Sequence, residues 1–176
     1  MSNIRKLVYT AILIAIGVVL PIALHPVPNA GQVLLPMHIP VLLCGFVCGF
    51  PYGLACGALL PLTSHLVTGM PPSAMLVPMV CELAVYGLAA SALYRLIRTK
   101  SRTLNLYASL IGAMLCGRIV YGVLNALIFS AGEYSLPIWL TAMFVTALPG
   151  IAVQLILIPA VILLLNRAKL SPLTNR

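Results

Sequence analysis

Apolar residues fill most of the chain in long runs, which are separated by short segments where proline, glycine or basic residues gather. A membrane-spanning α-helix needs about 20 predominantly apolar residues, because each residue adds about 1.5 Å. The pattern therefore predicts an all-α integral membrane protein with six transmembrane helices. Their expected ranges are Leu7–Leu24, Met37–Gly49, Tyr52–Thr68, Met75–Ile97, Leu106–Ser130 and Leu136–Asn166.

Three connections interrupt the first half of the chain. Residues His25–Pro36 contain proline, glycine and asparagine but also apolar side chains, so this loop either folds over an opening or rests in the membrane interface. The break at Phe50-Pro51 and the compact loop Gly69–Ser73 end the second and third helices. The second run is shorter than a full crossing, so we expect neighbouring helices to shield it.

Composition agrees with this assignment, since 62% of the residues are hydrophobic and 7% are charged. The net charge of +8 gathers beside the apolar runs rather than on one basic face, which argues against nucleic acid as a partner. Cytoplasmic segments carry an excess of Lys and Arg, so we expect both termini in the cytoplasm and Ala131–Ser135, which contains Glu133, as an outer turn. The basic residues that set this orientation are Arg5, Lys6, Arg95, Arg98, Lys100, Arg102, Arg167, Lys169 and Arg176.

Two opposite charges stand inside apolar runs, Arg118 in the fifth and Glu82 in the fourth. An ionisable group inside a membrane costs at least about 2.5 to 3.5 kcal/mol by insertion scales, so each needs compensation. Helical spacing places Arg118 on one face with Tyr121 and Asn125. We expect the two helices to face each other across a shared interior site, unless the two charges simply neutralise each other.

The fourth helix carries a second stripe, in which Met79, Glu82 and Tyr86 follow Met75 at helical spacing. This stripe resembles a pocket wall, although methionine stripes are also common core filler. His65, close to Pro61 in the third helix, either satisfies freed backbone groups or touches a ligand.

No enzyme motif accompanies this site. The five cysteines lie in apolar runs without the spacing of a zinc site or redox pair, so we expect packing roles, no metal and no cofactor. The chain lacks a phosphate-binding loop, an HExxH pair and a nucleophile elbow. A polar site without an energy source suits binding, and uphill transport would need energy from another chain. Glycines recur every fourth residue from 45 to 57, which predicts tight helix contact.

Four segments carry a family resemblance that covers nearly the whole chain. They are Ala11-x-x-x-Ala15, the stretch LLPMHIPVLLCGFVCGFPYG (Leu34–Gly53), GMPP (Gly69–Pro72) and GRIVYG (Gly117–Gly122). Combined with six expected helices and both ends inside, they resemble the substrate-binding S components of energy-coupling factor (ECF) vitamin transporters.

This resemblance implies a single domain, residues 1–176, that captures a vitamin at the outer face of a prokaryotic cell membrane. The family docks on a membrane scaffold subunit that is coupled to two ATPases, and the small residues of the first helix make that contact; here they are Ala11 and Ala15. The outer loop after the first helix acts as a lid, which here is His25–Pro36. The implied pocket agrees with the residues singled out above.

The ligand stays open between two chemistries. Arg118 suits a carboxylate such as niacin or pantothenate, because a fork of donors meets a carboxylate bidentately. Glu82 suits an amine or ring nitrogen, as in pyridoxine-like or pyrimidine ligands. Trp139 and Tyr134 either stack on a ring or anchor the last helix at the membrane interface. Two other functions stay open as well: a self-sufficient small carrier or channel, and a membrane scaffold without a ligand.

Overall fold

The structure is a computed structural model, and it describes residues 2–26, 28–97, 99, 101–129 and 135–167. Within these residues the chain is helical apart from short connections and contains no strand. The elements are α1 (Asn3–Ala23), α2 (Ala30–Leu34), α3 (His38–Cys48), α4 (Phe50–Thr68), α5 (Ser73–Leu96), α6 (Arg102–Leu124), the π-helix η1 (Asn125–Phe129), α7 (Leu136–Leu140), the π-helix η2 (Thr141–Thr146) and α8 (Leu148–Arg167).

Six helical stretches of this part of the chain are long and apolar enough to cross a membrane, which confirms the predicted fold class. Two of them differ clearly from the predicted ranges, and the bounds of the other four agree to within about four residues. The second stretch, Ala30–Cys48, gains length because the expected loop contains α2. The expected last helix is divided at Ala147, and α8 restarts beside Pro149, a residue that fits the first turn of a helix because it lacks an N–H.

Some predicted features lie outside the described residues. They are Arg98, Lys100, Lys169 and Arg176 of the basic clusters, and the expected outer turn Ala131–Ser135 with Glu133 and Tyr134, of which the structure describes Ser135 alone.

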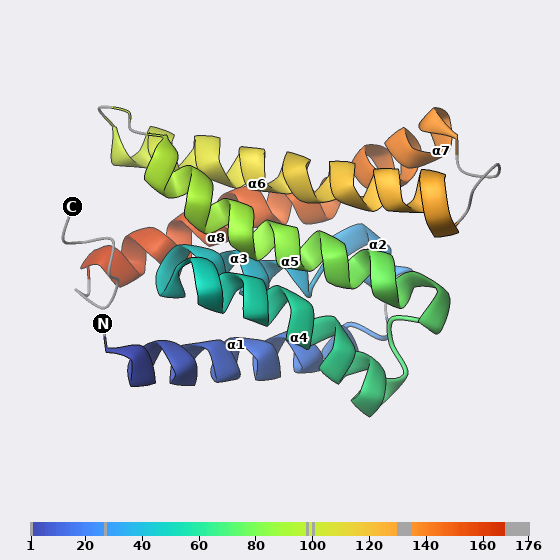
Figure 1. Cartoon of the computed structure of the whole chain (residues 1–176), viewed down its shortest axis with the longest axis horizontal. Helices are drawn as coiled ribbons and strands as arrows, with labels where there is room; N and C mark the ends of the chain where they lie inside the picture. Colours follow the sequence, from blue (N-terminus) through green and yellow to red (C-terminus); the bar gives the residue numbers. More distant parts are fainter. Residues whose placement is uncertain (1, 27, 98, 100, 130–134, 168–176) are drawn as a thin grey trace.

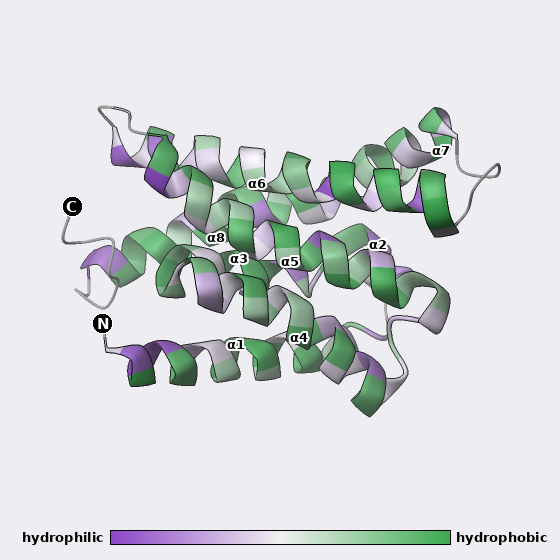
Figure 2. Ribbon diagram, in the orientation of Figure 1, coloured by the Kyte–Doolittle hydropathy of each residue, from purple (hydrophilic) through white to green (hydrophobic). Residues whose placement is uncertain are grey.

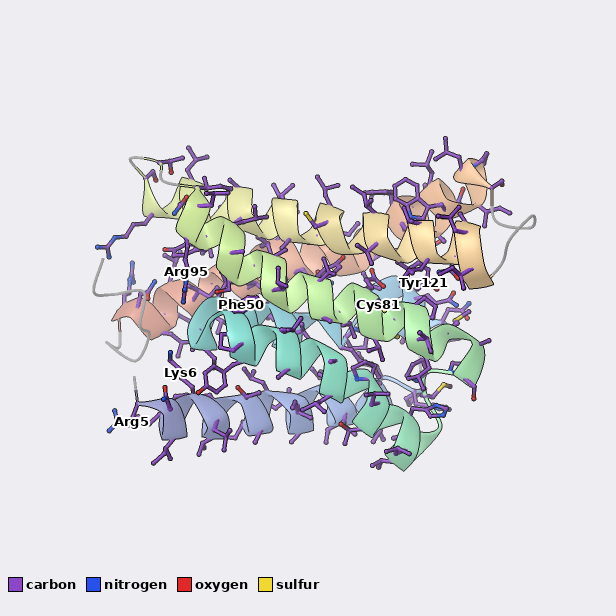
Figure 3. All side chains as sticks on the ribbon, viewed as in Figure 1. Arg5, Lys6, Phe50, Cys81, Arg95 and Tyr121 are labelled. Atoms are coloured by element: carbon purple, nitrogen blue, oxygen red, sulfur yellow. The ribbon has the colours of Figure 1, made fainter. Side chains whose placement is uncertain are left out.

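The long helices lie side by side along one axis, with α1 at one edge and α6 and α7 at the opposite edge (Figure 1). The start of α1 and the end of α8 lie at the same end of this bundle, as an even number of crossings requires. Hydrophilic residues at the start of α1, the start of α6 and the end of α8 lie at that end too (Figure 2). Arg5, Lys6 and Arg95 also lie there (Figure 3).

The short second span is the most enclosed of the six. In its most hydrophobic window, 61% of the residues are buried, compared with 11% for α1. The expectation that neighbouring helices shield this span is confirmed: α3 contacts α1, α4, α5 and α8. In contrast, α1 shows most of its apolar side chains to the surroundings, including Ile12 and Ile16.

Glycines bring α3, α4 and α5 into backbone contact. A Cβ atom on Gly53 would lie 2.7 Å from the Cα of Gly45, and a Cβ on Gly87 would clash with the carbonyl of Gly53. The predicted tight contact is therefore confirmed, and α5 takes part in it through Gly87. Gly49 has a different role: it forms the turn between α3 and α4 with a φ of +93°, a conformation that glycine adopts readily.

We expect Gly87→Ala to lower the thermal stability of the bundle, because the added methyl group has backbone on the opposite side and no room to move. Overpacking of this kind costs about 1–3 kcal/mol. The measurement is the fraction of monodisperse protein that survives heating in detergent, followed by size-exclusion chromatography. Gly31→Ala is the matched control, since no heavy atom lies within 4 Å of the new Cβ. Equal stability of the two variants would contradict this account of the packing.

Candidate functional site

Arg118 is enclosed by the helices rather than directed to the membrane surface. It lies on α6, and 1% of its surface is exposed. Its Nη1 donates a hydrogen bond to the carbonyl oxygen of Met143 and lies 3.5 Å from the sulfur of the same residue. The guanidinium carbon is 5.6 Å from the centre of the Phe144 ring, within the range of a cation–π contact. The segment η2 therefore covers Arg118 with backbone, sulfur and an aromatic ring.

Part of the guanidinium has no partner. Its Nε and Nη2 atoms are buried and make no hydrogen bond. An unsatisfied buried donor costs about 1–3 kcal/mol, and more when it is charged. Arg118 is therefore a cation for which this bundle supplies only part of the necessary acceptors.

Glu82 lies against His38 rather than Arg118, so the alternative in which the two charges neutralise each other is not what the described residues show. Its Oε1 is 3.5 Å from Nε2 of His38, and both side chains are buried. His38 stands at the start of α3, and its ring meets the ring of Tyr86 edge to face at a centroid distance of 4.9 Å. Among the described residues, the contact of Glu82 with His38 thus joins α5 to α3, and Glu82 makes no ion pair with Arg118.

Tyr86 lies between the two charged groups. Its hydroxyl is close enough to Glu82 and Arg118 to interact electrostatically with both, although the oxygen makes no hydrogen bond of normal geometry. The ring is fully buried and lies against Gly117, where a side chain on α6 would clash with it. Because Gly117 precedes Arg118, this contact fixes the two helices at the level of the site. The prediction that α5 and α6 face each other is confirmed.

Gln154 is a buried polar residue that the sequence interpretation missed. It lies on α8 with no exposed surface, and neither its amide oxygen nor its nitrogen has a hydrogen-bond partner. It shares a helix face with Gly150, which is packed against Val33 and Leu34 of the α2 segment. The signal was present, because Gln154 is a polar amide inside an otherwise apolar run. His38, which opens an apolar helix, was also missed as a site residue.

The other predicted site residues have partners of their own. Asn125 is buried and donates from Nδ2 to the Tyr121 carbonyl at 2.9 Å. Nδ1 of His65 lies 2.7 Å from the Pro71 carbonyl, so this histidine satisfies backbone at the loop after α4. Met79 is half-buried and packs against the hydrophobic core. Trp139 donates from Nε1 to the Arg118 carbonyl at 3.1 Å, which ties α7 to α6.

The site lies away from the end that carries the termini. Cys81, which precedes Glu82, and Tyr121, one turn from Arg118, both lie toward the opposite end (Figure 3). The α2 segment packs there against α8 and η2. Among the described residues, no three His, Cys, Asp or Glu side chains are placed to hold a metal ion. Arg118, Tyr86 and the His38–Glu82 contact offer instead a cation, a hydroxyl and a histidine beside a carboxylate in an apolar surrounding, a composition that suits a small-molecule binding site.

Comparison with known proteins identifies one family. A family model described as ECF transporter, substrate-specific component, matches residues 5–162. The match spans all of the transmembrane stretches except the first two residues of α1 and the last five of α8. No curated protein and no solved structure matches the chain.

We expect Gln154→Met to make the empty protein more heat-resistant than the wild type. The substitution keeps the volume and removes two polar atoms that have no partner, a change that is commonly neutral or stabilising. Thermal survival in detergent without added ligand measures the effect, and Leu155→Met on the same helix is the control. A lower stability of Gln154→Met would mean that the amide is satisfied in the folded protein.

Proposed function

Since the chain belongs to the substrate-specific components of ECF transporters, we propose that it binds a small water-soluble vitamin or vitamin precursor, of niacin, pantothenate or pyridoxine/pyrimidine type. Members of this family are transport subunits that take up their substrate together with the scaffold and ATPase subunits of the transporter. ATP hydrolysis therefore belongs to the partner chains, and this chain supplies recognition.

One observation carries the proposal: the incomplete partnering of Arg118, Tyr86 and Gln154 deep in the bundle. A structural polar network is stable when every member is satisfied, whereas a half-satisfied one is less stable than an apolar core. Arg118 and Glu82 add charge to this cost, because intramembrane ionisable groups are expensive. A ligand that supplies the absent acceptors and donors would offset that cost on binding.

We propose Glu82, Tyr86 and Arg118 as the central contacts, with Met79, Tyr121, Asn125 and His65 nearer the outer opening. The last four come from the parts of α4, α5, α6 and η1 that lie on the side of the site away from the termini. The segment around α2 is the proposed lid, since it packs on η2, the element that covers Arg118.

Orientation follows from charge. The basic residues Arg5, Lys6 and Arg95 lie at the end of the bundle where α1 begins and α8 ends (Figures 1 and 3), and we propose that this end faces the cytoplasm of a prokaryotic cell. The opposite end, which is nearer the site, then faces outward. The whole chain, 1–176, acts as a single substrate-binding domain.

The alternative is a stand-alone small secondary transporter or channel. The two functions differ in their energy source, so uptake into liposomes separates them. Accumulation that needs the scaffold, the ATPases and ATP supports the proposed function, whereas accumulation by this chain alone supports the alternative.

We expect Arg118→Ala to weaken ligand affinity at least about tenfold, because hydrogen bonds to a charged group are worth about 1.5–3 kcal/mol. The probe is the small molecule released by denaturing the purified wild-type protein, identified by mass spectrometry and titrated by calorimetry. The variant should still insert in the membrane and elute as the wild type does. Unchanged affinity would remove Arg118 from the site.

Docking is proposed on the exposed face of α1. Ala11 and Ala15 are both exposed, one turn apart, on the helix that the bundle covers least. Small residues allow another helix to approach closely in lipid, where no hydrophobic drive holds helices together. We propose that this face contacts the scaffold subunit.

We therefore expect the double change Ala11→Leu and Ala15→Leu to leave ligand binding intact and to abolish ATP-dependent uptake with the partner subunits. Calorimetry measures the first and radiolabelled uptake the second. Ile12→Leu with Ile16→Leu is the matched control, since these exposed neighbours are already large. Uptake that survives the alanine changes would reject the docking role.

A further inference from the structure

We infer that the ligand of this site is a small monocarboxylate that also carries a hydrogen-bond donor, and that Arg118 binds the carboxylate with the edge formed by Nε and Nη2. This inference rests on the proposed function and narrows its substrate class.

The free atoms of Arg118 form one edge of the guanidinium. Nη1 is occupied by the carbonyl of Met143, whereas Nε and Nη2 are buried without a partner. The N–H bonds of Nε and Nη2 that flank this edge are nearly parallel, and their spacing matches the two oxygens of a carboxylate. A carbonyl group would satisfy one of the two donors, and a carboxylate satisfies both.

The surroundings of Arg118 select the direction of approach. The guanidinium carbon of Arg118 lies over the Phe144 ring, 5.6 Å from its centre, so this ring occupies one side of the group and a ligand has to approach from another side. The Tyr86 hydroxyl lies close enough to the same guanidinium to interact with it, although it makes no hydrogen bond of normal geometry. A bound carboxylate therefore has an additional donor within the site.

Charge limits the anion to a single negative charge. Glu82 is buried and interacts with the same Tyr86 hydroxyl, so a second negative charge on the ligand would be repelled in an apolar surrounding. A phosphate monoester carries nearly two charges at neutral pH. One arginine beside one carboxylate suits a monoanion better.

The part of the site around His38 suits a hydrogen-bond donor on the ligand. Nε2 of His38 faces the Glu82 carboxylate at 3.5 Å, which favours the proton on that nitrogen. In the neutral ring Nδ1 is then an acceptor, and it is buried without a partner. A hydroxyl, amide N–H or protonated ring nitrogen of the ligand would donate to it. Among the types proposed above, pantothenate carries both groups, niacin carries the carboxylate, and neutral pyridoxine or pyrimidine lacks it.

Matched acid and neutral compounds test the inference. The protein is placed in lipid nanodiscs and titrated by calorimetry with nicotinate against nicotinamide and with pantothenate against panthenol. The small molecule released from the wild type by denaturation is identified in parallel by mass spectrometry. We expect the released compound to be a carboxylic acid, and any acid of the two pairs that binds to do so at least about tenfold more tightly than its neutral counterpart.

Arg118→Gln should abolish that preference by weakening the acid and leaving the neutral compound unchanged, while Arg118→Lys should restore only part of it, because lysine lacks the fork. Arg95→Gln, an exposed arginine at the termini end, is the control and should bind as the wild type does. His38→Ala should lower the affinity for the acid and for the neutral compound by the same factor, so that the ratio of the two affinities stays as in the wild type.

The outcomes distinguish a failure of the carboxylate assignment from a failure of the proposed vitamin-binding function. A neutral or cationic compound that is released and binds tightly overturns the carboxylate assignment and leaves vitamin binding intact. A released acid whose affinity does not depend on Arg118 overturns the role of the Nε and Nη2 edge. Failure to recover any small molecule, together with no binding of either pair and no uptake with the partner subunits, contradicts the proposed function itself.

Discussion

A guanidinium that never loses its proton, enclosed in a bundle surrounded by lipid, is the constraint on which the rest of this structure depends. Four elements meet around it: α6 carries Arg118, α5 supplies Tyr86, η2 supplies Met143 and Phe144, and α7 reaches its backbone through Trp139. The Met143 carbonyl accepts a hydrogen bond from Nη1, and the Phe144 ring lies against the guanidinium. The Nε and Nη2 atoms of Arg118 have no acceptor. A protein that needed this charge only for folding would supply hydrogen-bond acceptors for all the N–H groups of the guanidinium.

The packing differs on the two sides of this residue. On one side, glycines let α3, α4 and α5 approach to backbone contact, which fixes Glu82 and Tyr86 on a rigid wall. On the other side, η1 and η2 are π-helical, a geometry that is uncommon and that recurs at functional sites. Contacts between α6 and α8 are also sparser than those between α5 and its neighbours. The site thus lies where a tightly packed wall meets a less regular one.

The sequence predicts the fold well because membrane crossing leaves a strong signal in the length of the apolar runs. It also predicts Glu82 and Arg118 as interior residues, since a charge within an apolar run is too costly to face lipid. It did not predict that Glu82 pairs with His38, because the pairing depends on how α3 sits against α5, and no periodicity reports that. Nor did it reveal η2, since a π-helix needs no special residue. Gln154 could have been predicted as an interior residue in the same way as Arg118, because it is polar inside an apolar run, but an uncharged amide is a weaker signal than a charge.

The hydrogen bond from Trp139 to the Arg118 carbonyl has a practical consequence. Trp139 is the only tryptophan of the chain, and its indole is half-buried against Gly122, one turn from the arginine. Indole emission depends on local polarity, so any ligand that rearranges this corner of the bundle changes a signal with a single source. The protein therefore contains its own optical reporter, readable without labels or added dyes.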